Sequence, residues 1–440
     1  MIKSKLLNEF GLKNETVENI VTDYETFQNK ELLDELRNKI IQNLIDNNLT
    51  GDTTSEFVRN QIDKTLSGYD LSNVERSYIY NLINNEINGN GPITDLLEDK
   101  SITEIMVNGP NEIYVEIDGH IVLDHTVSFI NEDHIVRTIQ RMIQPLGRTI
   151  DTTNPMVDAR LRDGSRLNAV IPPLSIKGPV LTIRKFKEEL ATVEDLLRNG
   201  TLTSEMARFL EVCVREKSNV IISGGTGGGK TTLLNVLSSF ISENERIITI
   251  EDAAELRLKQ KHVISLETRL TNYEGTGEIT IRDLVINSLR MRPDRIIVGE
   301  VRGKEAFDML QAMNTGHTGS LTTMHANSPS DALNRLESMI LMTGMEIPVR
   351  AIREYIEKAI NIIVHIERMQ DGRRKVVNIS EISGFNEDVI STKEIFTYRQ
   401  IGILPNGEIE GEFVKHKYIP KVFKNLKARG INDINDIFAK

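Results

Sequence analysis

The spacing of hydrophobic residues changes along the chain, and each change predicts a different kind of element. In residues 1 to about 68 apolar residues recur at helical spacing, for example Leu36, Ile40 and Leu44, which predicts a small helical module. A further helix is predicted over Asn73–Ile87. It ends at the run Asn88-Gly89-Asn90-Gly91-Pro92, where glycine and proline interrupt the helical pattern.

Short β-rich runs follow this break and predict an α+β domain over residues 69–187. They are expected to form a curled antiparallel sheet with one helix over Glu132–Gln144. The predicted strands are Ile102–Val107, Glu112–Ile117, His120–Leu123, a hairpin over residues 158–170 that turns at Asp163-Gly164, and Val180–Phe186. The polar residues 188–203 are predicted to be a linker to the last domain, residues 204–440.

In residues 204–440 short apolar strands alternate with helices. This alternation predicts a mostly parallel sheet that helices cover on both faces. The predicted strands are Val220–Ile222, Arg246–Ile250, Arg295–Val298 and Ser320–Met324, followed by strand-like segments over Val376–Ile379 and Ile395–Ile401 and an amphipathic stretch over Lys421–Phe438. Ligands bind such sheets at the carboxyl ends of the strands, so the residues there are candidates for chemistry.

The composition limits the cellular compartment in which the protein is expected and the classes of partner that it is expected to bind. The net charge of −11 argues against bulk attraction to nucleic acid or to anionic lipid. Cys213 is the only cysteine, so the sequence allows neither an intramolecular disulfide nor a cysteine-based zinc site, and a reducing cytoplasm is expected. The first residues lack the long apolar core of a signal peptide, and apolar runs of membrane-spanning length are absent from the sequence. We therefore expect any membrane contact to be peripheral.

One stretch carries a specific chemical signal. Gly224, Gly229, Lys230 and Thr231 fill the fixed positions of the phosphate-loop pattern G-x-x-x-x-G-K-[ST], between a predicted buried strand and a predicted helix over Lys230–Phe240. The N–H groups of the first helical turn lack partners inside the helix and favour an anion. The five glycines of the loop permit positive φ and let the backbone bend around a β-phosphate.

This pattern predicts a site for a nucleoside triphosphate and Mg²⁺. Lys230 is expected to reach the β- and γ-phosphates, and the Thr231 hydroxyl to coordinate the metal. The predicted nucleotide-binding residues are Gly224, Gly225, Thr226, Gly227, Gly228, Gly229, Lys230, Thr231 and Thr232.

Acidic residues and a histidine follow three of the predicted strands. Glu251 and Glu300 each come at the end of an apolar run, and two such carboxylates beside a phosphate loop can divide the work of hydrolysis. One would hold Mg²⁺, for which we name Glu300, and one would polarise the attacking water; the sequence leaves open which of them activates water. His325, after the fourth strand, is predicted to sense the γ-phosphate.

Four segments resemble, in order, the Walker A, Asp box, Walker B and His box of the type II/type IV secretion traffic ATPases: Gly224–Thr232, Ile250–Leu256, Leu289–Gly303 and Thr315–Ser328. Upstream, Ile102–Gly109, Asp163–Asn168 and Ile183–Phe186 look like the amino-terminal domain of the tad (Flp) pilus branch, the CpaF-like proteins. The sequence departs from the family in having Gly228 where a serine is common, and it lacks the four-cysteine zinc module of the type II relatives.

The resemblance implies a fold and a function. It implies a RecA-like α/β ATPase domain preceded by a smaller PAS-like α+β domain, with the helical module in front. It implies a homo-hexamer that hydrolyses ATP and drives pilin assembly or secretion through an inner-membrane platform protein, from the cytoplasmic face of that membrane. Glu251, Glu300 and His325 would be catalytic, and Arg166 and Arg184 would act as arginine fingers.

Two other classes of function stay open. Ring ATPases with this core also move nucleic acid, although the acidic balance and an aromatic content of 5% give little sign of a nucleic-acid track. A nucleotide-gated scaffold without turnover is the third hypothesis, and Glu251 and Glu300 argue against it.

Overall fold

The computed structural model describes residues 32–33, 35–37, 39–41, 55–117, 119–186, 191–269, 276–386, 389–405, 407–428 and 435–438. The chain divides into two compact units, Met1–Lys187 and Glu188–Lys440. Most of the predicted helical module, the first residues of the predicted linker and part of the last amphipathic stretch lie outside the described residues. In the described part of the chain, each helix is too short or too polar to cross a membrane.

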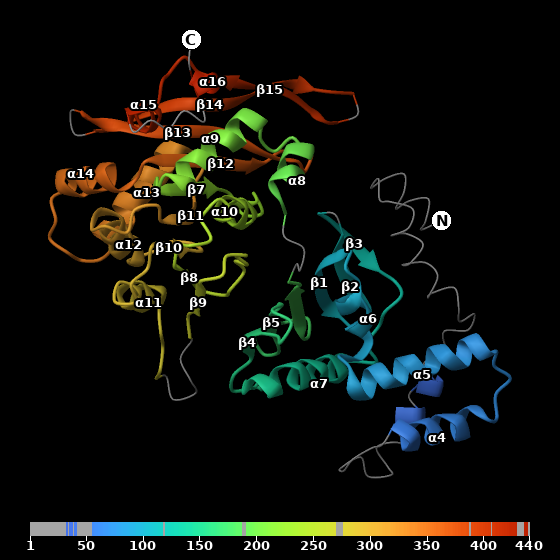
Figure 1. The fold of residues 1–440 in the computed structure, drawn as a ribbon. Coiled ribbons are helices and arrows are strands. Elements are labelled where there is room, and N and C mark those ends of the chain that lie inside the picture. Colours follow the sequence, from blue (N-terminus) through green and yellow to red (C-terminus); the bar gives the residue numbers. More distant parts are fainter. Residues whose placement is uncertain are drawn as a thin grey trace. The chain divides into compact units, whose positions relative to one another are not determined.

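The first unit begins with helices that share one small core (Figure 1). Helix α4 spans Ser55–Leu66 and α5 spans Asn73–Asn88, and helical residues between 32 and 41 pack with them. Helix α5 starts with a capping box in which Ser72 and Glu75 each bond the other's backbone N–H. Apolar residues at i, i+3 and i+4 spacing bury their side chains here, as the sequence pattern predicts; they are Leu36, Ile40, Val58, Ile62, Leu66, Ile79 and Ile83.

A buried ionic cluster joins these helices to the rest of the unit. The Glu86 carboxylate on α5 accepts from the Arg37 guanidinium and lies 2.9 Å from Nε2 of His134 on α7 (Glu132–Ile143). Burial would raise the pKa of Glu86, but hydrogen bonds and charge from His134 and Arg37 lower it below its ordinary value. The cluster therefore fastens three segments that are distant in sequence.

An antiparallel sheet of six strands forms the centre of the first unit. Its order is β3-β2-β1-β6-β5-β4. The strands are β1 Ile102–Gly109, β2 Glu112–Ile117, β3 His120–Asp124, β4 Met156–Arg160, β5 Arg166–Val170 and β6 Val180–Arg184. Helix α7 packs on the sheet in one apolar core, which the short helices η1 Gly91–Ile93 and α6 Thr94–Glu98 share through Ile93 and Leu96. The short helix η2 Gln144–Leu146 follows α7 directly. The predicted strands and helix are confirmed, including the turn at Gly164, where φ is +91°.

A sheet of nine strands forms the second unit, in the order β15-β14-β13-β12-β7-β11-β10-β8-β9. The strands are β7 Val220–Gly224, β8 Ile247–Glu251, β9 Val263–Glu267, β10 Arg295–Val298, β11 Leu321–His325, β12 Ile362–Arg368, β13 Arg374–Asn386, β14 Val389–Ile403 and β15 Ile409–Lys415. Strands β12, β7, β11, β10, β8 and β9 run parallel.

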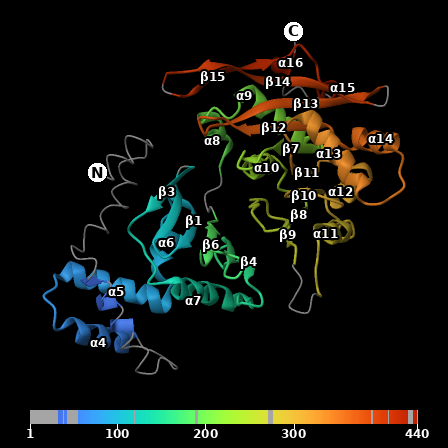
Figure 2. The ribbon, with the colours of Figure 1, turned by 180° about the vertical axis from the view of Figure 1, so that it is seen from behind.

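Helices cover both faces of this sheet, and the side chains of β7 show why. Val220 and Ile222 belong to one apolar core and Ile221 to the other, because successive side chains of a strand point to opposite faces. The first core includes α9 Ser204–Arg215, α10 Lys230–Ser238, α15 Lys421–Ala428 and α16 Asn435–Phe438, with α8 Val193–Arg198 beside them. The second includes α11 Ile281–Ser288, α12 Glu305–Asn314, α13 Pro329–Leu341 and α14 Val349–Ala359, which lie together in Figure 2.

The carboxyl-terminal strands are longer than the sequence pattern predicts. The apolar runs indicated two short segments, whereas β13 has 13 residues and β14 has 15. Their antiparallel pairing continues through polar residues such as Lys393 and Glu394, which contribute backbone hydrogen bonds without an apolar signal. Hydrophobic periodicity reports burial and cannot find such exposed ends.

Candidate nucleotide site

The phosphate loop lies between β7 and α10, as the motif predicts. Strand β7 is buried throughout, and its central position between β12 and β11 fixes where the loop begins. Gly229 is the N-cap of α10, with φ +96°, and because glycine has no side chain it cannot accept a hydrogen bond from the first N–H groups of the helix. The first helical turn therefore directs its N–H groups into the loop, where an anion would satisfy them.

The five glycines of the loop serve different purposes. Only Gly227 and Gly229 have positive φ, at +69° and +96°, so the expectation that all five supply this freedom is too broad. Gly224 is required for space, because a Cβ there would lie 2.2 Å from the carbonyl oxygen of Ile366. At Gly228 a Cβ would lie 3.1 Å from the carbonyl oxygen of Gly225, a tight but smaller conflict.

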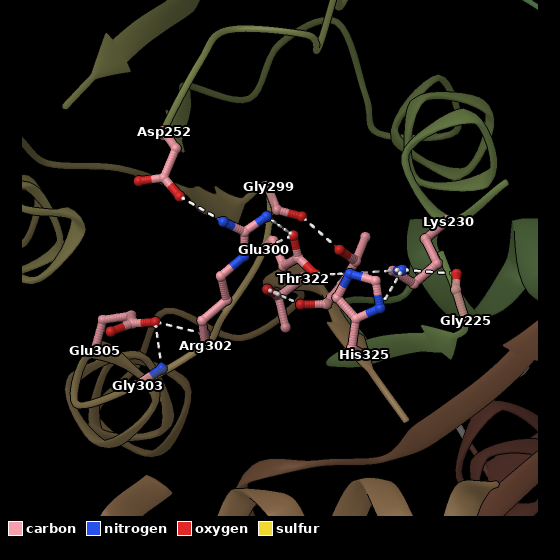
Figure 3. A network of polar contacts seen from close by, with 11 residues as sticks. Gly225, Lys230, Asp252, Gly299, Glu300, Arg302, Gly303, Glu305, Thr322 and His325 are labelled. Carbon is pink, nitrogen blue, oxygen red and sulfur yellow. Dashed lines mark hydrogen bonds and ion pairs between the residues drawn. The ribbon is translucent and has the colours of Figure 1, made fainter. Parts of the chain in front are cut away.

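Lys230 is the first residue of α10, and its ammonium lies between Gly225 and His325 (Figure 3). Its Nζ donates to the Gly225 carbonyl oxygen at 3.0 Å and lies 3.3 Å from Nδ1 of His325. Burial lowers the pKa of Lys230 below its ordinary value, and the nearby Glu300 carboxylate opposes this shift. A partly desolvated ammonium at this place suits a polyanionic ligand.

Glu300 and His325 meet beside Lys230. Nε2 of His325 lies 2.9 Å from Oε1 of Glu300, and Nε of Arg302 donates to Oε2 of Glu300 at 2.9 Å. Burial lowers the pKa of His325 below its ordinary value; the Glu300 carboxylate opposes this shift, and the positive charges of Lys230 and Arg302 add to it. The predicted residues at the ends of β10 and β11 are thus brought together in one polar network (Figure 3).

Glu251, at the end of β8, is held by the backbone. Its Oε1 accepts from the N–H groups of Glu255 at 2.9 Å and Leu256 at 3.1 Å, and the residue is 3% exposed. Gly299, at the end of the neighbouring strand β10, leaves room for this carboxylate, since a Cβ on Gly299 would lie 2.8 Å from Cγ of Glu251. The Gly-Glu sequence after β10, which replaces the usual Asp of a Walker B strand, therefore accommodates the carboxylate of the neighbouring strand.

Sequence reasoning missed two supporting groups, Arg302 and His365. Arg302 links Glu300 to Asp252: the distance from Nη1 of Arg302 to Oδ2 of Asp252 is 3.4 Å. His365 on β12 lies 2.8 Å, through Nδ1, from the hydroxyl of Ser223, the residue that precedes the loop. Only Arg302 carried a signal, its position two residues after Glu300; His365 lies 142 residues from Ser223, and the pattern around it indicates only a buried strand.

The remaining predicted residues have the following places. Thr231 is half-buried and Thr232 exposed in the first turn of α10, and Thr226 is exposed in the loop. Arg166 and Arg184 are cross-strand partners on β5 and β6, so they share one face of the first unit's sheet. Their role as arginine fingers stays a prediction.

Together these features define a class. A phosphate loop between a central parallel strand and a helix, with carboxylates and a histidine at the ends of neighbouring strands, is typical of a P-loop nucleoside triphosphatase on an α/β core.

Comparison with known proteins then gives the family. Residues 86–400 match the family model described as type II/IV secretion system protein, and the chain belongs to this family. The chain is an ATPase.

Individual relatives carry secretion or transfer names. The chain is 32% identical over 310 residues to the conjugal transfer protein TrbB of Rhizobium radiobacter, covering 69% of this chain and 90% of that one. It is 35% identical over 319 residues to the type IV secretion system protein PtlH of Bordetella pertussis, covering 64% and 91%. Among solved structures, the VirB11 ATPase of Brucella suis matches with 27% identity and a TM-score of 0.36, covering 68% and 97%.

Proposed function

We propose that this chain is a hexameric ATPase that couples ATP hydrolysis to the assembly of a tad (Flp)-type pilus, or to protein secretion, through an inner-membrane platform protein. The observation that carries the proposal is the contact chain from Lys230 through His325 to Glu300 at the mouth of the phosphate loop. This contact chain supports the proposal because a cation, an imidazole and a carboxylate side by side are groups that can position and electrostatically stabilise a transferring phosphoryl group.

The loop fits a nucleoside triphosphate and Mg²⁺ in chemistry and in shape. Glycines occupy the positions where a Cβ would meet backbone, the N–H groups of α10 open into the loop, and Lys230 offers its ammonium. The Thr231 hydroxyl and the Glu300 carboxylate are oxygen donors of the kind that Mg²⁺ prefers. When bound, the metal would neutralise charge on the phosphates.

The protein's own groups then divide the work. Glu251 keeps a fixed position because backbone N–H groups hold its carboxylate, and Glu300 shares its oxygens with His325 and Arg302. Either carboxylate can orient water, and His325, which contacts both Lys230 and Glu300, is placed to respond to loss of the γ-phosphate. Arg166 and Arg184 would supply arginine fingers from the amino-terminal domain.

The names of the relatives support export or transfer as the process that ATP hydrolysis drives. TrbB is named for conjugal transfer and PtlH for type IV secretion. We further propose that the chain consists of a helical module (residues 1–68), an α+β domain (69–187), a linker (188–203) and the ATPase domain (204–440). We propose that it lies on the cytoplasmic face of the inner membrane, with peripheral contact only. We also propose that it does not bind nucleic acid.

Steady-state phosphate release by the full chain across a concentration series tests the proposal. Specific activity should rise with concentration, because sites completed by a neighbouring copy require assembly. Glu300→Gln should keep ATP binding and lose turnover by at least about 100-fold, since the amide cannot act as a base or hold the metal by charge.

The alternatives predict other results. Full activity at all concentrations, with the molecular mass of one copy, would remove the ring from the proposal. ATP binding by the wild type without phosphate release would support a nucleotide-gated scaffold. Salt-dependent binding of single-stranded DNA that stimulates turnover would support a nucleic-acid motor.

A further inference from the structure

The hairpin formed by β12 and β13 contacts the phosphate loop at three places. His365 on β12 bonds the hydroxyl of Ser223, just before the loop, at 2.8 Å. The carbonyl oxygen of Ile366 lies against Gly224, where any Cβ would collide with it. Arg374, the first residue of β13, donates its Nε–H to the carbonyl oxygen of Gly227 at 3.1 Å. The hairpin therefore supports the loop from its first residue to its exposed tip.

Arg374 fits closely against the loop. Its Cδ lies 2.9 Å from the position that a Cβ on Gly229 would occupy, so Gly229 provides room for the arginine stem as well as a positive φ. Nη1 of Arg368 lies 4.0 Å from the corresponding position on Gly227. The sequence motif alone explains these glycines by the phosphate, whereas the structure adds a side chain on the outer surface of the loop.

Arg374 lies next to a second arginine, Arg368, across the strand pair. Arg368 and Arg374 are direct cross-strand partners of β12 and β13. Both lie beside the loop that the family uses for ATP.

The neighbouring arginine faces elsewhere, which makes the direction of Arg374 specific. Arg373 donates to the Ile409 carbonyl oxygen at 2.7 Å and to Asp371 at 2.8 Å, and so fastens the start of β15. Arg373 lies just before β13, and its contacts are to other residues than those of Arg374. A change at Arg374 can thus affect the phosphate loop while leaving the contact to β15 in place.

We propose that Arg374 is a positioning residue of the nucleotide site: by holding the Gly227 carbonyl oxygen outward, it keeps the loop in the shape whose N–H groups converge on the phosphates. Gly227 is a glycine at φ +69°, so the peptide that follows it can rotate at little steric cost. Rotation would turn the carbonyl oxygen toward the anion site and remove an N–H donor from it. A charge-assisted hydrogen bond opposes that rotation. The inference rests on the proposed placement of the nucleotide at this loop.

Three variants of the full chain test this role: Arg374→Ala, Arg374→Lys and Arg374→Gln. The matched control is Arg399→Ala on β14, an exposed arginine that pairs with Glu412 at 2.8 Å. Binding of fluorescently labelled ADP with Mg²⁺ gives the Kd, phosphate release gives KM and kcat, and hydrogen exchange without nucleotide reports on the peptide over residues 220–234.

We expect Arg374→Ala to weaken ADP binding about tenfold and to raise KM more than it lowers kcat, because one charge-assisted hydrogen bond is lost. Exchange in residues 220–234 should accelerate before any nucleotide is added. Arg374→Lys should recover little, since an ammonium keeps the charge but lacks the planar Nε–H. Arg374→Gln, which keeps a planar amide, should change binding in the same direction and provides the measurement if the alanine variant does not fold. Arg399→Ala should resemble the wild type.

The contrary results separate the two proposals. If Arg374→Ala and Arg374→Gln bind ADP like the wild type while Lys230→Ala loses binding, Arg374 has no positioning role but the site stands. If Lys230→Ala also binds normally, the placement of the nucleotide is wrong. Weaker binding that lysine restores, with unchanged exchange in the loop, would overturn positioning in favour of a direct charge contact with the ligand.

Discussion

The Cβ position of Gly299 lies 2.8 Å from Cγ of Glu251, so a glycine at the end of β10 makes room for a carboxylate at the end of β8. These strands are parallel neighbours, with Val298 opposite Ile250. The backbone beside the carboxylate completes its surroundings through the N–H groups of Glu255 and Leu256. The position of Glu251 therefore depends on a residue 48 positions away that has no side chain of its own.

We predict that Gly299→Ala lowers kcat about 100-fold while ATP binding changes little, because a catalytic group displaced by about 1 Å loses that much. Gly299 is outside the region of positive φ, so the effect is steric. Phosphate release and labelled-nucleotide binding measure it. Gly68→Ala, where the added Cβ meets nothing within 4 Å, is the control. Wild-type kcat in the Gly299 variant would show that the position of Glu251 does not limit turnover.

The buried pair Arg295–Glu245 supplies a second prediction. Arg295 is fully buried at the start of β10; its Nε donates to Glu245 at 2.7 Å and its Nη1 to the Gly319 carbonyl oxygen at 3.0 Å. Glu245→Ala leaves this charge without its carboxylate and should cost about 3–5 kcal/mol in the free energy of unfolding. Denaturant titration measures the loss. Glu243→Ala, which removes an exposed partner of Lys261, should cost less than about 1 kcal/mol. Equal effects would contradict the assignment.

The same pair gives an acid dependence with a definite sign. Burial would raise the pKa of Glu245, but hydrogen bonds and charge from Arg295, together with Lys217, lower it below 4.5. The stability from this carboxylate is therefore present above its unfolded pKa of about 4.5 and is lost as the pH falls through the folded value. The difference in unfolding free energy between wild type and Glu245→Ala should shrink below pH 4.5. A difference that grows on acidification would be inconsistent with this reasoning.

His365 predicts a dependence nearer neutral pH. Burial lowers its pKa below 6.5, outweighing the opposing effects of Glu367, the backbone at Asn327 and Asp331. The unfolded chain then binds the proton more readily, so stability is present above pH 6.5 and falls as the pH drops below it. Denaturant titrations at pH 7.5 and 5.5 should show that the free energy of unfolding falls less between these two pH values for His365→Gln than for the wild type. Identical losses would mean that His365 does not titrate on unfolding.

Local pattern was enough to predict much of this protein. Alternating apolar strands and helices predicted the covered parallel sheet, and β10 begins and ends where expected. The spacing of Gly224, Gly229 and Lys230 predicted the phosphate loop because the motif is a local backbone geometry. Glu251, Glu300 and His325 were named as candidates because functional groups gather where strands end at one edge of a parallel sheet, and the structure places all three at such strand ends.

Only the tertiary structure decided which side chains meet. Lys230 and His325 are 95 residues apart, and Arg374 and Gly227 are 147 apart. Hydrophobic periodicity identifies a strand but not its neighbours; the order β8, β10, β11, β7, β12 results from packing across the whole unit. The sequence alone therefore predicted most of the elements around the phosphate loop and the chemistry available at their ends, but not the strands β9, β12 and β15 or the full length of β13 and β14. Long-range strand pairing decided the contacts, because convergence of distant side chains depends on sheet order and register, which local spacing does not encode.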